Sequence, residues 1–260
     1  MSDDAKSMTA RADSHFEKGN APKALVYYRL ARELTKSRPL LRELSLKIAR
    51  TCATLKYHDD AVANYREAMK YSPVREQSNI MVEIARQYHA SKNYRYAVAY
   101  FRKALEHECP PRFVGDVHYW LGRSLYKVPE MDTNDESLIR LEQAKSKPRN
   151  LVMKWHIHTT RGNALRKKER YDEALAEFRN ALNTNLDVMG NAGHLYNSTA
   201  ACYKAMGDEE NAVRWYRKAI HAPHSKHSTK GWSSLQIARI LRDSKPSAAQ
   251  QELEEAKRFF

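Results

Sequence analysis

The stretch Ala174-Leu-Ala-Glu-Phe-Arg-Asn-Ala-Leu182 contains a spacing of alanine, aromatic residue, arginine and alanine that recurs along the chain. Clear copies begin at Ala24, Ala61, Ala97 and Ala212, and looser copies begin at Ser137 and Ala249. The starting positions 24, 61, 97, 137, 174, 212 and 249 differ successively by 37, 36, 40, 37, 38 and 37 residues. Self-similarity at a period between about 20 and 50 residues is the signature of a solenoid. The sequence therefore predicts a chain built from seven similar units.

A second helical segment precedes each copy and carries a small residue at a nearly fixed offset. Twelve residues before the copy, this position is occupied by Ala12, Ala49, Ala85, Gly162 and Ala200. When both helices of a pair carry a small residue at the point where they cross, they can approach closely, with the side chains of one in the grooves of the other. Turn residues such as Gly19 and Gly207 lie between the two segments, and neighbouring Asn and Asp residues suit helix N-caps. Each unit is therefore expected to be a pair of antiparallel helices.

These combined spacings resemble the tetratricopeptide repeat family. The segments Leu121-Gly122…Leu125 and Gly207-Asp208…Ala212…Tyr216…Ala219 are close matches to its pattern. The resemblance implies an all-α, right-handed superhelical solenoid of antiparallel helix pairs that spans residues 1–260 as one array. The expected repeats cover approximately residues 5–36, 42–73, 78–110, 115–149, 155–187, 193–224 and 231–260.

Composition places the chain in a reducing, aqueous compartment. Charged residues make up 29% of it, and no apolar run approaches the roughly 20 residues that span a bilayer. The acidic start at Asp3 and Asp4 has no apolar core of the kind found in signal peptides. The three cysteines are scattered and odd in number, which argues against a disulfide framework. We expect a cytoplasmic protein without membrane insertion.

Nothing in the sequence nominates an enzyme. Nucleotide-binding glycine loops, the GxSxG nucleophile motif and the HExxH zinc motif are all missing from it. His156 and His158 would point about 200° apart on one helix, so they cannot share a metal ion. His221, His224 and His227 lack accompanying thiolates or carboxylates and form only a weak metal signal. The sequence predicts no catalytic residue, no cofactor and no metal.

The more informative feature is a second stripe on the first helix of each unit. It begins at the residue after the small packing residue and includes side chains three or four positions away, which share its helix face. By resemblance to the family, this stripe would line the concave ligand groove. The predicted partner-binding residues are Arg50, Arg86, Tyr119, Arg123, Lys127, Asn163, Arg166, Asn197, Lys204 and Arg239.

Arginine forks suit carboxylates, so Arg50, Arg86 and Arg123 are expected to form a ladder for an acidic segment. An alternative stays open at this point. Glu43, Glu83 and Asp116 lie on the same helices and would neutralise the ladder internally.

Three functions follow from these patterns. The first is a non-enzymatic adaptor or scaffold that binds an acidic peptide segment of another protein. The second uses the formal net charge of +14 to bind RNA or a polyanionic filament such as a microtubule. Against RNA, most tyrosines occupy packing positions and no strip of exposed aromatics beside basic residues is evident. The third is a structural subunit of a large assembly, with an oligomer or partner contact at the C-terminal repeat.

Overall fold

The structure is a computed structural model that describes residues 2–107, 109–146, 148–184 and 192–260. The described residues form fourteen α-helices and two short 3-10 helices, without any strand. This confirms the predicted all-α class of paired antiparallel helices. The chain divides into two compact units, residues 1–140 and 141–260. The predicted end of the fifth repeat at residue 187 lies outside the described residues.

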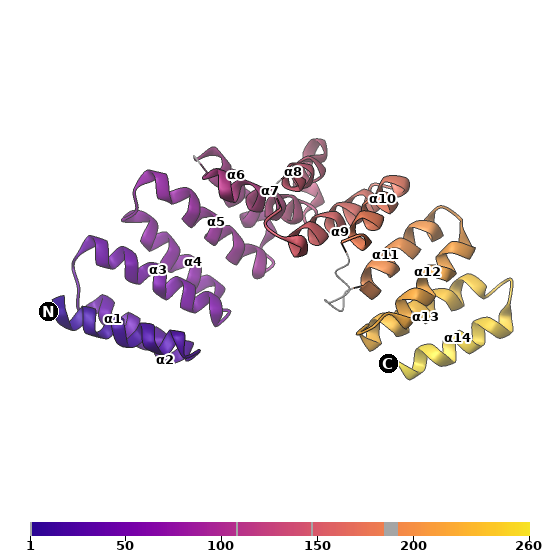
Figure 1. The fold of residues 1–260 in the computed structure, drawn as a ribbon, viewed down its shortest axis with the longest axis horizontal. Coiled ribbons are helices and arrows are strands. Elements are labelled where there is room, and N and C mark those ends of the chain that lie inside the picture. The colour runs from indigo at the N-terminus through magenta and orange to yellow at the C-terminus, as the bar shows by residue number, and fades with distance from the viewer. Residues whose placement is uncertain (1, 108, 147, 185–191) are drawn as a thin grey trace. The chain divides into compact units, whose positions relative to one another are not determined.

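The N-terminal unit is a series of helix hairpins (Figure 1). Contacts pair α1 with α2, α3 with α4, and α5 with α6, and each second helix also packs on the first helix of the next pair. The helices are α1 (Ser2–Glu17), α2 (Ala21–Glu33), α3 (Arg38–Thr54), α4 (His58–Lys70), α5 (Val74–Ala90), α6 (Tyr94–Glu106) and α7 (Pro111–Leu125). Two 3-10 helices, η1 (Pro129–Met131) and η2 (Thr133–Asp135), follow, and α8 (Glu136–Lys145) contains the boundary between the units.

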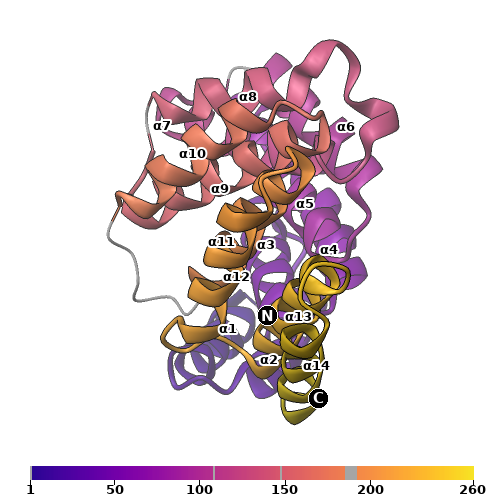
Figure 2. The same ribbon diagram turned by 90° about the vertical axis from the view of Figure 1, so that its right-hand side faces the viewer.

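The C-terminal unit repeats the hairpin plan. Its remaining helices are α9 (Leu151–Lys167), α10 (Tyr171–Leu182), α11 (Ala192–Ala205), α12 (Glu209–His221), α13 (His227–Leu241) and α14 (Pro246–Arg258). Contacts pair α9 with α10, α11 with α12, and α13 with α14; Figure 2 shows the partners lying side by side. Contacts also join α9 to α11 and α11 to α13. The first helices of the hairpins therefore form one inner layer of this unit.

The recurring alanines explain why the helices pair. Ala24, Ala61, Ala97, Ala174 and Ala212 are all fully buried. An alanine keeps two helix backbones close, and the aromatic residue four positions later fills the adjoining space. This aromatic is Tyr28, Tyr65, Phe101, Phe178 or Tyr216, each at most 3% exposed. The sequence pattern that predicted the fold is thus the pattern of its core.

Turns within the hairpins share a backbone conformation. Gly19 and Gly207 have φ values of 74° and 80°, and the corresponding turns elsewhere place Lys56, Lys92 and Glu169 in the same left-handed region. The expected N-caps are only partly present. Asn20 and Asp208 accept hydrogen bonds from the backbone N–H groups of Lys23 and Asn211. At the corresponding cap positions of α4 and α10 stand Tyr57 and Arg170, with no side-chain cap bond.

The arginines that follow the core aromatics link successive outer helices. Arg29 reaches Asp60, Arg102 reaches Glu136, and Arg217 lies 4.0 Å from Glu252. The acidic insertion before α8 joins this layer, because Glu130 also accepts hydrogen bonds from Arg95 of α6. These side chains pair locally along the outer helices. None of the helices in the described ranges has the length and apolar composition needed to cross a membrane.

Candidate functional site

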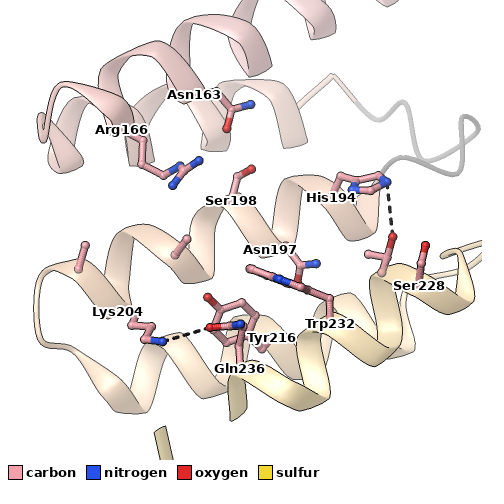
Figure 3. Close-up of a pocket in the computed structure, with 13 residues that line it drawn as sticks. Asn163, Arg166, His194, Asn197, Ser198, Lys204, Tyr216, Ser228, Trp232 and Gln236 are labelled. Atoms are coloured by element: carbon pink, nitrogen blue, oxygen red, sulfur yellow. Dashed lines mark hydrogen bonds between the residues drawn. The ribbon is translucent and has the colours of Figure 1, made fainter. Parts of the chain in front are cut away.

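A hollow of about 840 Å³ lies on the inner layer of the C-terminal unit. We call it the C-terminal pocket. Its lining includes Asn163 and Arg166 from α9, Asn197, Ala201 and Lys204 from α11, and Trp232 and Gln236 from α13. Figure 3 shows Asn163 and Arg166 facing the α11 and α13 side chains across this space. The buried ring of Tyr216, from α12, also lines it.

The pocket brings together four of the predicted partner-binding residues, namely Asn163, Arg166, Asn197 and Lys204. It also contains residues that the stripe did not include, above all Trp232 and Gln236. Gln236 and Trp232 stand three and seven residues before Arg239, so they lie near the same face of α13. The predicted set named only Arg239 on this helix and did not extend two turns back along that face, so it missed the part of α13 that lines the pocket.

The cations of the pocket face no carboxylate. Among the described residues, no carboxylate oxygen lies within 4.0 Å of the Arg166 guanidinium, and its Nε is buried without a hydrogen-bond partner. Lys204 donates from Nζ to the neutral Oε1 of Gln236 at 3.1 Å. None of the described lining residues is an aspartate or a glutamate. Both positive charges are therefore available to an anionic group.

Asn163 and Asn197 each have one polar atom of the side-chain amide in a hydrogen bond to the protein. Asn163 Nδ2 donates to the backbone oxygen of Thr159 at 3.0 Å. The buried Asn197 side chain is fixed by Ser233 Oγ at 2.7 Å. Each amide has a second polar atom that makes no hydrogen bond to the described residues. Two amide groups in fixed positions are suited to the backbone of a bound peptide, because a peptide presents N–H and C=O groups at regular intervals.

Arg166 also affects the groups beneath the pocket. Burial raises the pKa of Tyr216 to about 12 and that of Cys202 to about 11, and the positive charge of Arg166 opposes both shifts. Neither group ionises near neutral pH. The tyrosine and the cysteine beneath the pocket are thus neutral, and the charge of the site comes from Arg166 and Lys204.

Of the three arginines predicted to bind an acidic segment in the N-terminal unit, the middle one, Arg86, is neutralised by carboxylates of the protein itself. Arg86 pairs with Glu83 at 3.1 Å and with Asp116 at 3.4 Å. On α3, Lys47 pairs with Asp13 and Glu43 at 2.8 and 3.0 Å. The internal pairing that the sequence left open is present here. This unit therefore offers a partner less unpaired positive charge than three arginines would suggest.

The remaining predicted residues have varied surroundings. Arg50 is exposed on α3. Arg123 donates to Tyr119 Oη at 2.7 Å and lies over the Trp120 ring, 5.3 Å from its centroid. Tyr119 is only 4% exposed, so it supports Arg123 and offers little surface of its own. The Lys127 ammonium lies over the Tyr126 ring. Arg239 is exposed on α13 and lies outside the C-terminal pocket.

Within residues that the structure describes, no three or more His, Cys, Asp or Glu side chains gather in a way that would hold a metal ion.

Comparison with protein-family models finds the tetratricopeptide repeat at residues 43–75, 156–188 and 193–221. The last two segments cover most of α9 and α11, from which the C-terminal pocket is partly lined, together with α10 and α12. No curated protein sequence matches the chain significantly.

Solved structures share the fold at low identity. The apo form of RapI covers 98% of this chain and 76% of its own, with a TM-score of 0.71 and 13% identity. The pilF protein of Pseudomonas aeruginosa covers 86% of this chain and 94% of its own, with a TM-score of 0.62 and 16% identity. YrrB, described as a TPR protein with an unusual peptide-binding site, covers 87% and 97%, with a TM-score of 0.56 and 18% identity. The chain carries tetratricopeptide repeats and has an all-helical repeat fold.

Proposed function

We propose that this tetratricopeptide-repeat protein is a non-enzymatic adaptor that holds an acidic segment of another protein in the C-terminal pocket. The single observation that carries the proposal is the pair of cations, Arg166 and Lys204, in a pocket whose described lining contains no carboxylate. A guanidinium without an internal partner gains most from an external carboxylate, because that contact can satisfy the buried Nε–H donor of Arg166. YrrB supports a peptide as ligand only by analogy of fold.

The distribution of charge over the C-terminal unit supports the same proposal. The inner helices α9, α11 and α13 carry no aspartate or glutamate. Their basic residues are Lys154, Arg161, Lys167, Lys230 and Arg239 in addition to the two cations of the pocket. The outer helices α10, α12 and α14 carry the carboxylates. A segment of negative charge would meet attraction along the inner layer and repulsion along parts of the outer one.

The proposal gives the N-terminal unit a supporting role. Arg50 and Arg123 would contact an acidic segment there, while Arg86 would first have to exchange its internal carboxylates for external ones. That exchange yields little, because the pairs already satisfy the guanidinium. We place the interaction in the cytoplasm, since Cys52, Cys109 and Cys202 are free thiols.

Affinity purification followed by mass spectrometry would identify the partner, and the affinity of its acidic segment would then be measured by calorimetry. We expect Arg166→Glu with Lys204→Glu to weaken binding by about 30-fold or more. The bound segment would exclude water from its ion pair with the half-buried Arg166, and loss of such a pair costs about 2 kcal/mol or more, while the exposed Lys204 adds less. The matched control is Arg179→Glu with Arg214→Glu, which makes the same charge change at exposed positions of α10 and α12. Equal losses in both variants, or none in either, would refute the pocket as the binding site.

A cluster of aromatic and basic side chains favours a second candidate, binding of single-stranded RNA. Tyr96 is 60% exposed and stacks on Tyr88 at 5.2 Å, and Arg66 donates to the hydroxyls of Tyr88 and Tyr100. This is an exposed aromatic group beside a basic residue, which the sequence patterns did not reveal. Such groups can stack bases.

Salt dependence separates the two candidates. A protein that neutralises six to ten phosphates loses about 10³–10⁵ in affinity between 50 and 200 mM salt. An acidic peptide held by two cations would lose less than about tenfold over the same range. Oligonucleotide binding with the steep dependence, abolished by Tyr96→Ala, would favour RNA over the peptide.

A further inference from the structure

The C-terminal pocket has an aromatic part beside its cationic part. Trp232 of α13 lines it with 41% of its surface exposed. Its indole meets the buried ring of Tyr216 edge-on, with centroids 5.7 Å apart. An exposed tryptophan braced by a buried ring is a rigid apolar surface. Residues of this kind carry a large share of the energy at protein interfaces.

Small side chains on α11 leave room in front of this surface. At the position after the small packing residue, α3, α5 and α7 carry Arg50, Arg86 and Arg123, whereas α11 carries Ala201. Ala201 and Ala205, one turn later, both line the pocket. A long side chain at position 201 would occupy the space that these alanines leave. The pocket can therefore admit a side chain of the ligand.

The two parts are separated by one helical turn. Trp232 and Gln236 lie four residues apart on α13, which corresponds to about 6 Å along the helix axis. Gln236 holds the Lys204 ammonium at 3.1 Å, so it marks the cationic end. Figure 3 shows Lys204 and Gln236 together at one end of the pocket and Trp232 nearer its other end. In an extended peptide, side chains two residues apart point to the same side and lie about 6.6 Å apart.

We propose that the pocket recognises an extended peptide that has an acidic residue and an aromatic or large aliphatic residue at positions i and i+2, in either order. This rests on the proposed function and deepens it. The acidic group would contact Lys204 and Arg166, and the apolar side chain would pack on Trp232. The amides of Asn163 and Asn197 each keep one polar atom for a ligand. They favour an extended peptide, because the backbone groups of a helical peptide are already hydrogen-bonded to one another.

Synthetic peptides with one Phe and one Asp in a Ser/Gly background test the proposal on the full chain. The two residues are placed one, two, three or four positions apart, in both orders, and a peptide with Asp alone serves as reference. We expect the two-position peptides to bind about tenfold more tightly than the reference, a gain of the size that one aromatic anchor supplies. The other spacings should gain less than threefold.

Two variants assign the preference to the pocket. Trp232→Ala removes the aromatic surface, and Ala201→Gln fills the space in front of it without removing a buried side chain. Each should abolish the spacing preference, so that the four spacings bind with equal affinity, and thermal unfolding confirms that the variants are folded. Equal affinity for all spacings, with loss in the Arg166→Glu and Lys204→Glu variant, would overturn this inference and leave the proposed function standing. Binding that ignores Arg166 and Lys204 would overturn both.

Discussion

At three turns within the helix pairs, a residue with a side chain occupies the left-handed backbone region. Lys56, Lys92 and Glu169 have φ values of 62°, 65° and 61°, at turns equivalent to those where Gly19 and Gly207 stand. An L-residue in this region loses roughly 1–2 kcal/mol through the closeness of Cβ to the carbonyl oxygen. Glycine avoids that cost. The repeat geometry is thus imposed on residues that do not prefer it.

Replacement of one of these residues by glycine should stabilise the protein. For Glu169→Gly we expect the free energy of unfolding to rise by about 0.5 kcal/mol, because relief of strain exceeds the greater entropy of glycine in the unfolded chain. Gly207→Ala should lower it by about 1 kcal/mol for the converse reason. Urea unfolding of both variants measures the two effects. A Glu169→Gly protein less stable than the parent would show that the turn is not strained.

Gly162 illustrates a contact that a single methyl group would disturb. A Cβ at this position would lie 2.5 Å from Cε1 of Phe178, a fully buried ring in the repeated stretch of α10. Alanine would otherwise favour the helix by about 1 kcal/mol. Overpacking a rigid core costs about 1–3 kcal/mol and should prevail, because Phe178 has no free space to enter. We expect Gly162→Ala to destabilise the protein in thermal unfolding, and Phe178→Leu to restore part of the loss in the double variant.

At the scale of helices, a buried carboxylate joins three elements of the C-terminal unit. Glu177 of α10 is 4% exposed and contacts His158 and Arg161 of α9 and Lys145 of α8. Burial alone would raise the pKa of Glu177. The hydrogen bond with His158 and the charges of Arg161 and Lys145 outweigh burial and lower the pKa to about 2. The folded protein therefore favours the ionised form.

The lowered pKa of Glu177 makes stability depend on acid. A carboxylate whose pKa falls on folding stabilises the native state above its ordinary pKa of 4.5, and this contribution is lost as the pH falls from 4.5 towards 2. We expect Glu177→Gln to remove this part of the acid sensitivity. At pH 7 it should cost about 3 kcal/mol, since Arg161 and Lys145 lose their buried partner. Denaturant unfolding at a series of pH values measures both effects. An unchanged slope between pH 4.5 and 2 would contradict the assignment.

Helix pairing was predictable from sequence because small residues at fixed intervals have a direct structural meaning. Ala174 and Gly162 occur twelve residues apart, and each lies where two helices approach. The predicted stripe located Arg166 and Lys204 in the pocket. Trp232 stands two turns before Arg239 on nearly the same face of α13, and its role depends on how α13 meets α11 and α12. No periodicity within a single repeat contains that information.

At the scale of the whole molecule, the feature that the sequence predicts least well is which charged side chains form ion pairs with one another. Arg86 and Arg166 both belong to the predicted stripe, Arg86 directly after the small residue of its helix and Arg166 one turn further on. Arg86 meets Glu83 and Asp116, while Arg166 meets no carboxylate within the described residues. The difference depends on which side chains neighbouring helices supply. The net charge of +14 therefore says little about where a partner binds. The distribution of acidic and basic residues between the inner and outer helices says more about where a partner binds.

On this view an acidic segment of a partner protein occupies the C-terminal pocket. A photoreactive amino acid placed at position 201, which lines the pocket, tests it most directly, with position 179 on the outer helix α10 as the matched control. We predict that position 201 cross-links to an acidic segment of the captured partner and that Arg166→Glu with Lys204→Glu abolishes the product. Cross-links from position 179 alone, or from position 201 irrespective of these two residues, would contradict the claim.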